Sequence, residues 1–258
     1  MLSKNQIKWV HSLELKKNRR KDGLFVAEGP KVVGDLLRAG YVARAIFSTT
    51  ERPNAQLITD DELRKLSFLQ HPQEVLAVFE IPLNSQFSIP NREATILNSE
   101  FSTLNSNLSL ALDGVQDPGN LGTIMRLADW YGIRNIFASK STVDVYNHKV
   151  VQATMGAISR VKVHYCDLDF FFDDYDDMPV MGTFLDGDNI YGAKLPEGGA
   201  FVIFGNEGQG ISPKIAAHVT QRLHIPAMPR KGEHSESLNV GIAAAITISE
   251  LRRNHLIK

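Results

Sequence analysis

Amide, carboxylate and glycine residues that could bind a small ligand lie together in the segment AFVIFGNEGQGIS, residues 200–212. An apolar run there breaks into a glycine-rich loop that contains Asn206 and Glu207. Such a run is typical of a buried parallel strand whose carboxyl end opens onto a binding crevice. The glycines follow the order G-x-x-G-x-G, whereas a dinucleotide-binding turn has G-x-G-x-x-G leading directly into a helix. The glycine order therefore argues against a redox enzyme with a dinucleotide cofactor.

A second group of small polar residues follows the strand predicted at 222–225. The chain turns at Pro226, and the elbow SESLN, residues 235–239, then begins an apolar helix. No G-x-S-x-G sequence surrounds the serines of this elbow, which argues against a serine hydrolase. Small or polar residues thus follow two predicted strands and begin one predicted helix. This pattern predicts a pocket built largely from backbone groups.

A third group lies in DPGNLGTIMRLADWYG, residues 117–132. Asn120 has the residue type that caps a helix by accepting a backbone N–H. Arg126 falls among apolar residues, so we expect it on the buried side of the helix, where it needs a partner. Taken locally, the segment allows two interpretations. In one, Asn120 is only a cap and Arg126 forms a surface ion pair; in the other, the two residues belong to the same binding site as the Gly-rich loop.

The elements that must position these residues alternate between strand and helix. In the second part of the chain we predict about six strands, mostly parallel, with helices on both faces: 108–113, 134–139, 161–165, 180–184, 201–205 and one ending at Ile225. Helices are predicted at 121–132, 147–159 and 238–256, with a short one from Ser212. Because ligands bind at the carboxyl ends of parallel strands, the three groups are expected to meet at one edge.

The first part of the chain predicts a smaller α/β domain at 1–82. Strands are expected at 24–28, 43–48 and 75–80, with helices from Pro30 and over 60–66. The stretch 83–107 is rich in Asn, Ser and Pro and reads as a linker. The second domain then covers 108–258, and 258 residues suit two modest domains.

Composition excludes several classes of protein. Apolar content of 43% and charged content of 22% are those of a soluble globular protein. No apolar stretch approaches the roughly 18 residues of a membrane span, and the first residues lack the apolar core of a signal peptide, so we expect a cytoplasmic protein. Cys166 is the single cysteine, which excludes an internal disulfide and a cysteine zinc site. His234 lacks the second histidine at helical spacing that zinc enzymes use, so no metal is expected.

The net charge of −1 hides an uneven distribution. Seven Lys and Arg residues lie before Gly23, and a basic terminus can neutralise RNA phosphates; the candidates are Lys16, Lys17, Arg19, Arg20 and Lys21. The alternative for this terminus is a solvated helix of mixed charge. Six Asp residues between Asp167 and Asp177 are interleaved with aromatic ones. They predict a surface helix with an apolar face, which should point away from any nucleic acid.

Taken together, the three groups resemble the motifs of the SpoU family of RNA ribose 2′-O-methyltransferases, within the knotted SPOUT superfamily. The matching pieces are 117–132, FGNEGQGIS at 204–212, and IP followed by SESLNVGIAAA at 225–245. The resemblance covers 108–258. Residues 1–82, with FVAEGPKVVGDLL, resemble the ribosomal-protein L30e-like RNA-binding domain that often precedes this catalytic domain.

The resemblance implies a cofactor, a partner and a set of roles. The cofactor is S-adenosylmethionine, the substrate is rRNA or tRNA, the chain forms a homodimer, and its end is threaded into a trefoil knot. Catalytic roles fall on Asn120, Arg126, Glu207, Ser237 and Asn239. Cofactor contacts fall on Thr183, Gly205, Asn206, Gly210, Ile225, Pro226 and Leu238.

The sequence leaves three questions open. The resemblance makes Arg126 the base, whereas the pKa of a free guanidinium, above about 12, favours a role in orienting phosphate and ribose. A non-catalytic RNA-binding or ribosome-assembly factor with the same fold is the alternative function, although a binder need not keep the five catalytic positions. The loop after Pro226 is longer and more charged than the commonest form, and Arg230, Lys231 and His234 either contact RNA or lengthen a solvent loop.

Overall fold

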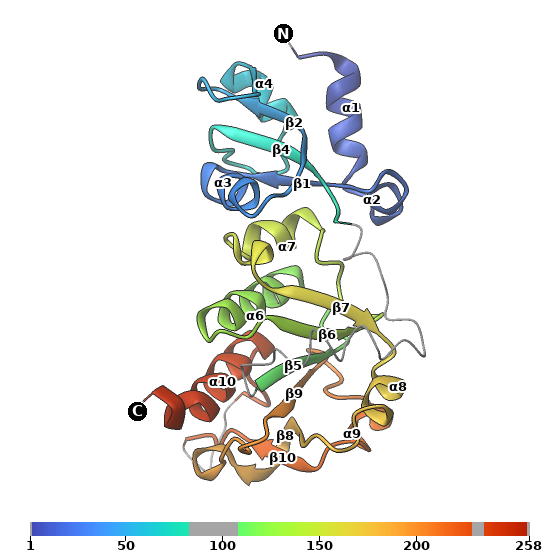
Figure 1. Cartoon of the computed structure of the whole chain (residues 1–258), viewed down its shortest axis with the longest axis vertical. Coiled ribbons are helices and arrows are strands. Elements are labelled where there is room, and N and C mark those ends of the chain that lie inside the picture. Colours follow the sequence, from blue (N-terminus) through green and yellow to red (C-terminus); the bar gives the residue numbers. More distant parts are fainter. Residues whose placement is uncertain (1, 83–107, 229–234, 257–258) are drawn as a thin grey trace. The chain divides into compact units, whose positions relative to one another are not determined.

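The computed structural model describes residues 2–82, 108–228 and 235–256. Residues 254–256 are described by their backbone alone. The chain divides into two compact units (Figure 1). Unit 1 comprises Met1–Gln86 and Asp144–Arg160, and unit 2 comprises Phe87–Val143 and Val161–Lys258. The sequence places 144–160 within the second domain, whereas by its contacts this segment belongs to unit 1. The predicted linker, 83–107, lies outside the described residues.

Unit 1 is built on a four-stranded sheet with the order β1-β4-β2-β3. Its strands are β1 (Leu24–Glu28), β2 (Ala43–Ser48), β3 (Gln56–Leu57) and β4 (Val75–Glu80). Strand β4 pairs antiparallel with both β1 and β2, while β2 and β3 are parallel. Its helices are α1 (Lys4–Ser12), α2 (Lys16–Asp22), α3 (Pro30–Arg38), α4 (Asp60–Leu66) and α7 (His148–Ala153), followed by the 3₁₀ helix η2 (Ala157–Ser159). The strands and helices predicted for residues 24–80 are confirmed.

Local chemistry explains where the helices of unit 1 begin. Helices α1 and α4 each start with a capping box, in which Ser3 pairs with Gln6 and Thr59 with Glu62. The helix predicted at 147–159 is shorter than expected, because α7 stops at Ala153. Met155 and Gly156 then take left-handed φ values of 51° and 96°, which a continuing α-helix does not permit.

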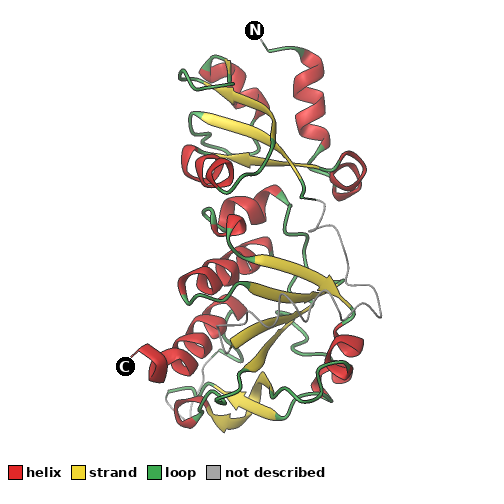
Figure 2. Ribbon diagram, viewed as in Figure 1, coloured by secondary structure: helices red, strands yellow, loops and turns green. Residues whose placement is uncertain are grey.

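Unit 2 contains a six-stranded, wholly parallel sheet with the order β10-β8-β9-β5-β6-β7. Its strands are β5 (Leu108–Asp113), β6 (Asn135–Ser139), β7 (Lys162–Cys166), β8 (Val180–Asn189), β9 (Ala200–Gly205) and β10 (Gln221–His224). Its helices are α6 (Pro118–Trp130), α8 (Leu168–Asp173), α9 (Pro213–Ala216) and α10 (Val240–Leu256), with the 3₁₀ helix η3 (Ile190–Gly192). Helices α6 and α10 cover one face and α8 and α9 the other, as predicted (Figure 2).

Both faces of this sheet are apolar, which is why its strands read as continuous hydrophobic runs. On the α8 side, the aromatic rings of Phe137, Phe171, Phe172 and Phe201 pack against one another. Helix α8, Leu168–Asp173, forms the first half of the acidic run, with Phe171 and Phe172 buried and Phe170 exposed. The predicted surface helix with one apolar face is therefore confirmed.

The trefoil knot stays a prediction. The loop 229–234, which joins the end of the sheet to the helix that would be threaded, lies outside the described residues. The likeness of unit 1 to ribosomal protein L30e also stays a prediction.

Candidate active site

The loop that follows β9 is held in shape by Asn206. Its backbone N–H and carbonyl pair with Gly210 at 2.9 Å each, and its Oδ1 accepts hydrogen bonds from the N–H groups of Gly208 and Gln209 at 3.0 Å. Its Nδ2 donates to the carbonyl of Gly114, just past β5, at 2.8 Å. A Cβ on Gly205 would lie 2.1 Å from the backbone of Gly210, so only glycine allows the loop to close here. The loop is rigidly tied to the neighbouring strand end.

Helix α6 begins beside this loop, and its cap is Asp117. The Asp117 Oδ1 accepts a hydrogen bond from the Asn120 N–H at 2.8 Å, and Pro118 occupies the first helical position. The interpretation of Asn120 as the helix cap is therefore wrong. An Asp directly before a Pro is the signal that could have identified the true cap. The buried Asn120 side chain is left free to bond elsewhere.

Asn120 joins the three segments that the sequence singles out. Its Nδ2 donates to Glu207 Oε1 at 2.9 Å, and its Oδ1 accepts from Asn239 Nδ2 at 2.9 Å. Asn239 in turn caps α10, because its Oδ1 accepts from the N–H groups of Gly241 and Ile242 at 2.9 and 3.3 Å. The structure thus brings Asn120, Glu207 and Asn239 into one hydrogen-bonded chain at the carboxyl edge of the sheet.

The Glu207 carboxylate already accepts several hydrogen bonds. Besides Asn120, it accepts from the N–H groups of Gln116 and Asp117 at 3.2 and 3.1 Å. Partial burial raises the pKa of Glu207, but the hydrogen bonds from Asn120 and from the backbone outweigh it, so the net pKa is lowered. An ionised carboxylate that is already bonded to three donors orients its neighbours and is poorly suited to take a further proton.

Arg126 and Ser237 do not take part in this hydrogen-bond network. Arg126 is exposed, which corrects the expectation that it faces the interior. The buried face of α6 runs through Leu121, Ile124, Met125 and Ala128, and Arg126 lies about 100° around the helix from Met125. Ser237 is also exposed, before the start of α10. Within the described residues, neither side chain forms a hydrogen bond or an ion pair.

The expected cofactor contacts follow adjacent strands. Because β10, β8 and β9 are parallel neighbours, Ile225 with Pro226, Thr183 and Gly205 lie at the same edge of the sheet. Thr183 Oγ1 donates to the carbonyl of Ile203 at 3.3 Å, which ties β8 to β9 at this point. Leu238, in the segment that leads to Asn239, is 49% exposed.

Sequence reasoning missed a further pair that ties this edge together. The Asp113 carboxylate, at the end of β5, accepts from the Ser212 N–H at 2.8 Å. The two residues lie 99 positions apart, so no local pattern could have paired them.

Among the expected RNA contacts, Arg19 has a different role. Lys16, Lys17, Arg20 and Lys21 are exposed on α2. Arg19 is buried: its Nη2 lies 2.6 Å from Asp144 Oδ2, and its Nη1 donates to the carbonyls of Leu13 and Glu14. Its guanidinium is thus committed to the protein, and a phosphate contact from Arg19 is excluded in this structure.

The described residues contain neither a cluster of metal ligands nor a membrane-spanning helix. Between residues 2 and 256, leaving out 83–107 and 229–234, no group of three or more His, Cys, Asp and Glu side chains could hold a metal ion. No helix in those ranges is both long and apolar enough to cross a membrane.

Two family models match the chain. One, described as the SpoU rRNA Methylase family, matches residues 107–249, and one described as the MRM3-like substrate binding domain matches 4–77. A relative from Bacillus subtilis, 23S rRNA (guanosine(2553)-2′-O)-methyltransferase RlmP, is 28% identical over 97% of both chains. A structure from Porphyromonas gingivalis, assigned to the TrmH family of RNA methyltransferases, is 39% identical with a TM-score of 0.79, covering 98% of this chain and 99% of that one. An AdoMet-bound rRNA methyltransferase from Sinorhizobium meliloti is 26% identical, with a TM-score of 0.81 and coverage of 98% and 96%.

Proposed function

This chain belongs to the SpoU rRNA Methylase family, whose model matches more than half of it, and we propose that it methylates a ribose 2′-hydroxyl of ribosomal RNA. The methyl donor is S-adenosylmethionine. The observation that carries the proposal is the chain Glu207–Asn120–Asn239, which holds together the three segments at the carboxyl edge of the parallel sheet. The name of the Bacillus subtilis relative supports ribosomal RNA as the substrate.

The residues at this edge fit such a donor. In the loop closed by Gly205, the N–H groups of Asn206, Gly208, Gln209 and Gly210 are already paired, which leaves the carbonyls of residues 207–209 for a ligand. Gly210, with a φ of 70°, would meet nothing within 4 Å if it carried a Cβ. Leu238 and Met228, which are 49% and 83% exposed, flank the end of β10 and the start of α10. Apolar side chains beside open backbone groups suit a ligand with an aromatic base and polar edges.

The bound donor supplies an electrophilic methyl group, so the protein must align the acceptor hydroxyl and stabilise the charge that develops on its oxygen. We assign the alignment to Asn120, whose amide is fixed by Glu207, and to Asn239, whose amide is fixed by Asn120. Arg126 carries a guanidinium with donors available to a phosphate or a ribose. Because a guanidinium gives up a proton with difficulty, we assign Arg126 to orientation of the RNA and stabilisation of the oxyanion. We assign Ser237 a hydrogen bond to the ribose.

We further propose that the chain acts as a homodimer. Trp130, at the end of α6, is 84% exposed, and Ile242, in the first turn of α10, is 52% exposed. Helices α6 and α10 pack together, so an apolar surface on this pair suits a second copy. The cytoplasmic location stays a prediction.

Transfer of a labelled methyl group from S-adenosylmethionine tests the function. Ribosomal RNA from cells that lack this gene is the acceptor, and the methylated ribose is then mapped. We expect Asn120→Ala to lose about a hundredfold in rate, because Glu207 and Asn239 both lose their common partner and the aligned groups shift. The matched control is Asn135→Ala at the start of β6, which removes a hydrogen bond to His164 at the opposite edge of the sheet. Wild-type protein that binds this RNA without methylating it would instead support the non-catalytic alternative.

A further inference from the structure

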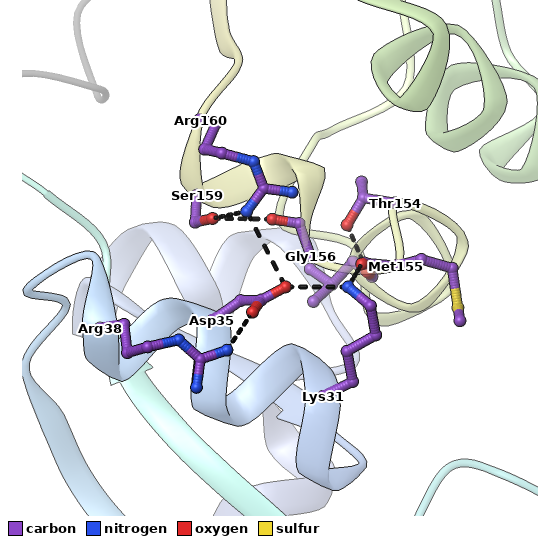
Figure 3. A network of polar contacts seen from close by, with 9 residues as sticks. Lys31, Asp35, Arg38, Thr154, Met155, Gly156, Ser159 and Arg160 are labelled. Carbon is purple, nitrogen blue, oxygen red and sulfur yellow. Dashed lines mark hydrogen bonds and ion pairs between the residues drawn. The ribbon is translucent and has the colours of Figure 1, made fainter. Parts of the chain in front are cut away.

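Three cationic side chains of unit 1 converge on one carboxylate (Figure 3). Asp35 lies in α3, where Lys31 Nζ contacts its Oδ2 at 3.0 Å and Arg38 Nη2 contacts its Oδ1. Arg160, which follows η2, places its Nη1 3.8 Å from the same Oδ2. We call Lys31, Asp35, Arg38 and Arg160 the Asp35 cluster.

Positive charge is in excess in this cluster. Lys31 and Arg38 share a single carboxylate, so at least one positive charge stays unbalanced even before Arg160 is counted. Burial raises the pKa of Asp35, but the hydrogen bonds from Lys31 and Arg38 outweigh it and lower the pKa, so the carboxylate remains charged. By contrast, Arg64 pairs one to one with Asp61 in α4.

The turn at 154–160 is shaped to approach this carboxylate. Lys31 Nζ donates to the Met155 carbonyl at 2.7 Å. A Cβ on Gly156 would lie 2.1 Å from Asp35 Oδ2, so the close approach requires glycine at this position. The turn covers Asp35, whose side chain is 12% exposed, and brings Arg160 to it. The cationic groups are consequently held in place before any ligand arrives, which reduces the entropy lost on binding.

The cations themselves face solvent. The side chain of Arg38 is 73% exposed and that of Lys31 is 60% exposed. Arg38 uses one of its nitrogens on Asp35, and a guanidinium has five N–H donors, so most of them are open to an external acceptor. Because Asp35 is covered while Lys31 and Arg38 are exposed, the cluster presents positive charge to the solvent.

We propose that the Asp35 cluster binds a backbone phosphate of the substrate RNA, with Arg38 and Lys31 as the contacting groups and Asp35 as the residue that positions them. This inference rests on the proposed function, since it names where unit 1 holds the RNA. A phosphodiester carries one negative charge and accepts hydrogen bonds from paired N–H donors, the geometry that arginine provides. The cluster lies on α3 and the 154–160 turn, so it is separate from the exposed cations of α2.

The test is the salt dependence of RNA binding by the full chain, with ribosomal RNA from cells that lack this gene as the probe. Arg38→Gln and Lys31→Gln are compared with Arg64→Gln, an exposed arginine in a balanced i,i+3 pair. Each phosphate that the protein no longer neutralises should lower the magnitude of the slope of log K against log[salt] by about 0.7 to 0.9. We expect this change in Arg38→Gln and Lys31→Gln, with a several-fold rise in KM and an unchanged kcat. Thermal unfolding of each variant reports whether the fold is kept.

The possible outcomes separate this inference from the proposed function. If the slopes of Arg38→Gln and Lys31→Gln match that of Arg64→Gln while wild-type protein methylates RNA, the Asp35 cluster only joins α3 to the turn and the inference is wrong. If wild-type protein methylates no RNA but the two variants still lower the slope, the phosphate site stands and the proposed function falls.

Discussion

Replacing Arg19 with Ala should destabilise unit 1 strongly, because the arginine is buried and forms four hydrogen bonds. Its Nε and Nη2 contact Asp144 Oδ2 at 3.1 and 2.6 Å, and its Nη1 donates to two backbone carbonyls. Arg19→Ala leaves Asp144, whose side chain is 15% exposed, without a cation. Removing one partner of a buried ion pair typically costs about 3 to 5 kcal/mol. We expect a loss of that size in the free energy of unfolding of unit 1.

Urea unfolding followed by tryptophan fluorescence measures this loss. The chain has two tryptophans, Trp9 in α1 and Trp130 in α6, so Trp130→Phe leaves Trp9 as the only reporter of unit 1. In that background, Lys17→Ala is the matched control on the exposed side of α2 and should change stability by less than about 0.5 kcal/mol. The double variant Arg19→Met with Asp144→Leu should recover much of the loss, since neither charge is then stranded.

The reasoning is refuted by one pattern of results. If Arg19→Ala costs less than about 1 kcal/mol and weakens RNA binding as much as Lys17→Ala does, then Arg19 is a phosphate contact and not a structural residue.

Three other perturbations test separate parts of the structure. Burial raises the pKa of Glu28 despite hydrogen bonds from its neighbours. Unit 1 should therefore lose stability as the pH rises through that raised pKa. Glu28→Gln should flatten this pH dependence in urea titrations at several pH values. Gly205→Ala places a Cβ 2.1 Å from the backbone across the loop, which should cost about 1 to 3 kcal/mol of stability. The displaced loop should also bind the cofactor more weakly in calorimetry, and unchanged affinity would show that the loop does not contact the cofactor. Charge reversal at Lys16, Lys17 and Arg20 should weaken RNA binding more at low salt than at high salt, and equal affinity would mean that α2 is only solvated.

The sequence predicted the helices and strands well because each of them is determined by residues close together in the chain. Continuous apolar runs identified the buried parallel strands, including Leu108–Asp113 and Ala200–Gly205. The meeting of Asn120, Glu207 and Asn239 followed from the rule that parallel strands share a carboxyl edge. The meeting of these three segments was thus predicted from the sequence, although the hydrogen bonds that join them were not.

The features that sequence reasoning missed depend on contacts between distant residues or on backbone angles. The partner of Arg19 lies 125 positions away, so its charge suggested an RNA contact when it is in fact buried. Arg126 was expected inside because its neighbours are apolar, yet their spacing puts them on another face of α6. The early end of α7 depends on the positive φ of Met155, which a residue of that type rarely adopts.

Because Asp144–Arg160 belongs to unit 1, the order of synthesis affects when unit 1 can fold. During synthesis, α2 emerges from the ribosome long before Asp144 does, so Arg19 has no counter-ion until β5, α6 and β6 have also been translated. Folding of the amino-terminal unit should therefore be completed late and after translation of part of its neighbour. A gene fragment that stops at Gln86 would encode a polypeptide with a stranded cation in its interior, and full recovery of its fold would require adding 144–160 back as a separate peptide.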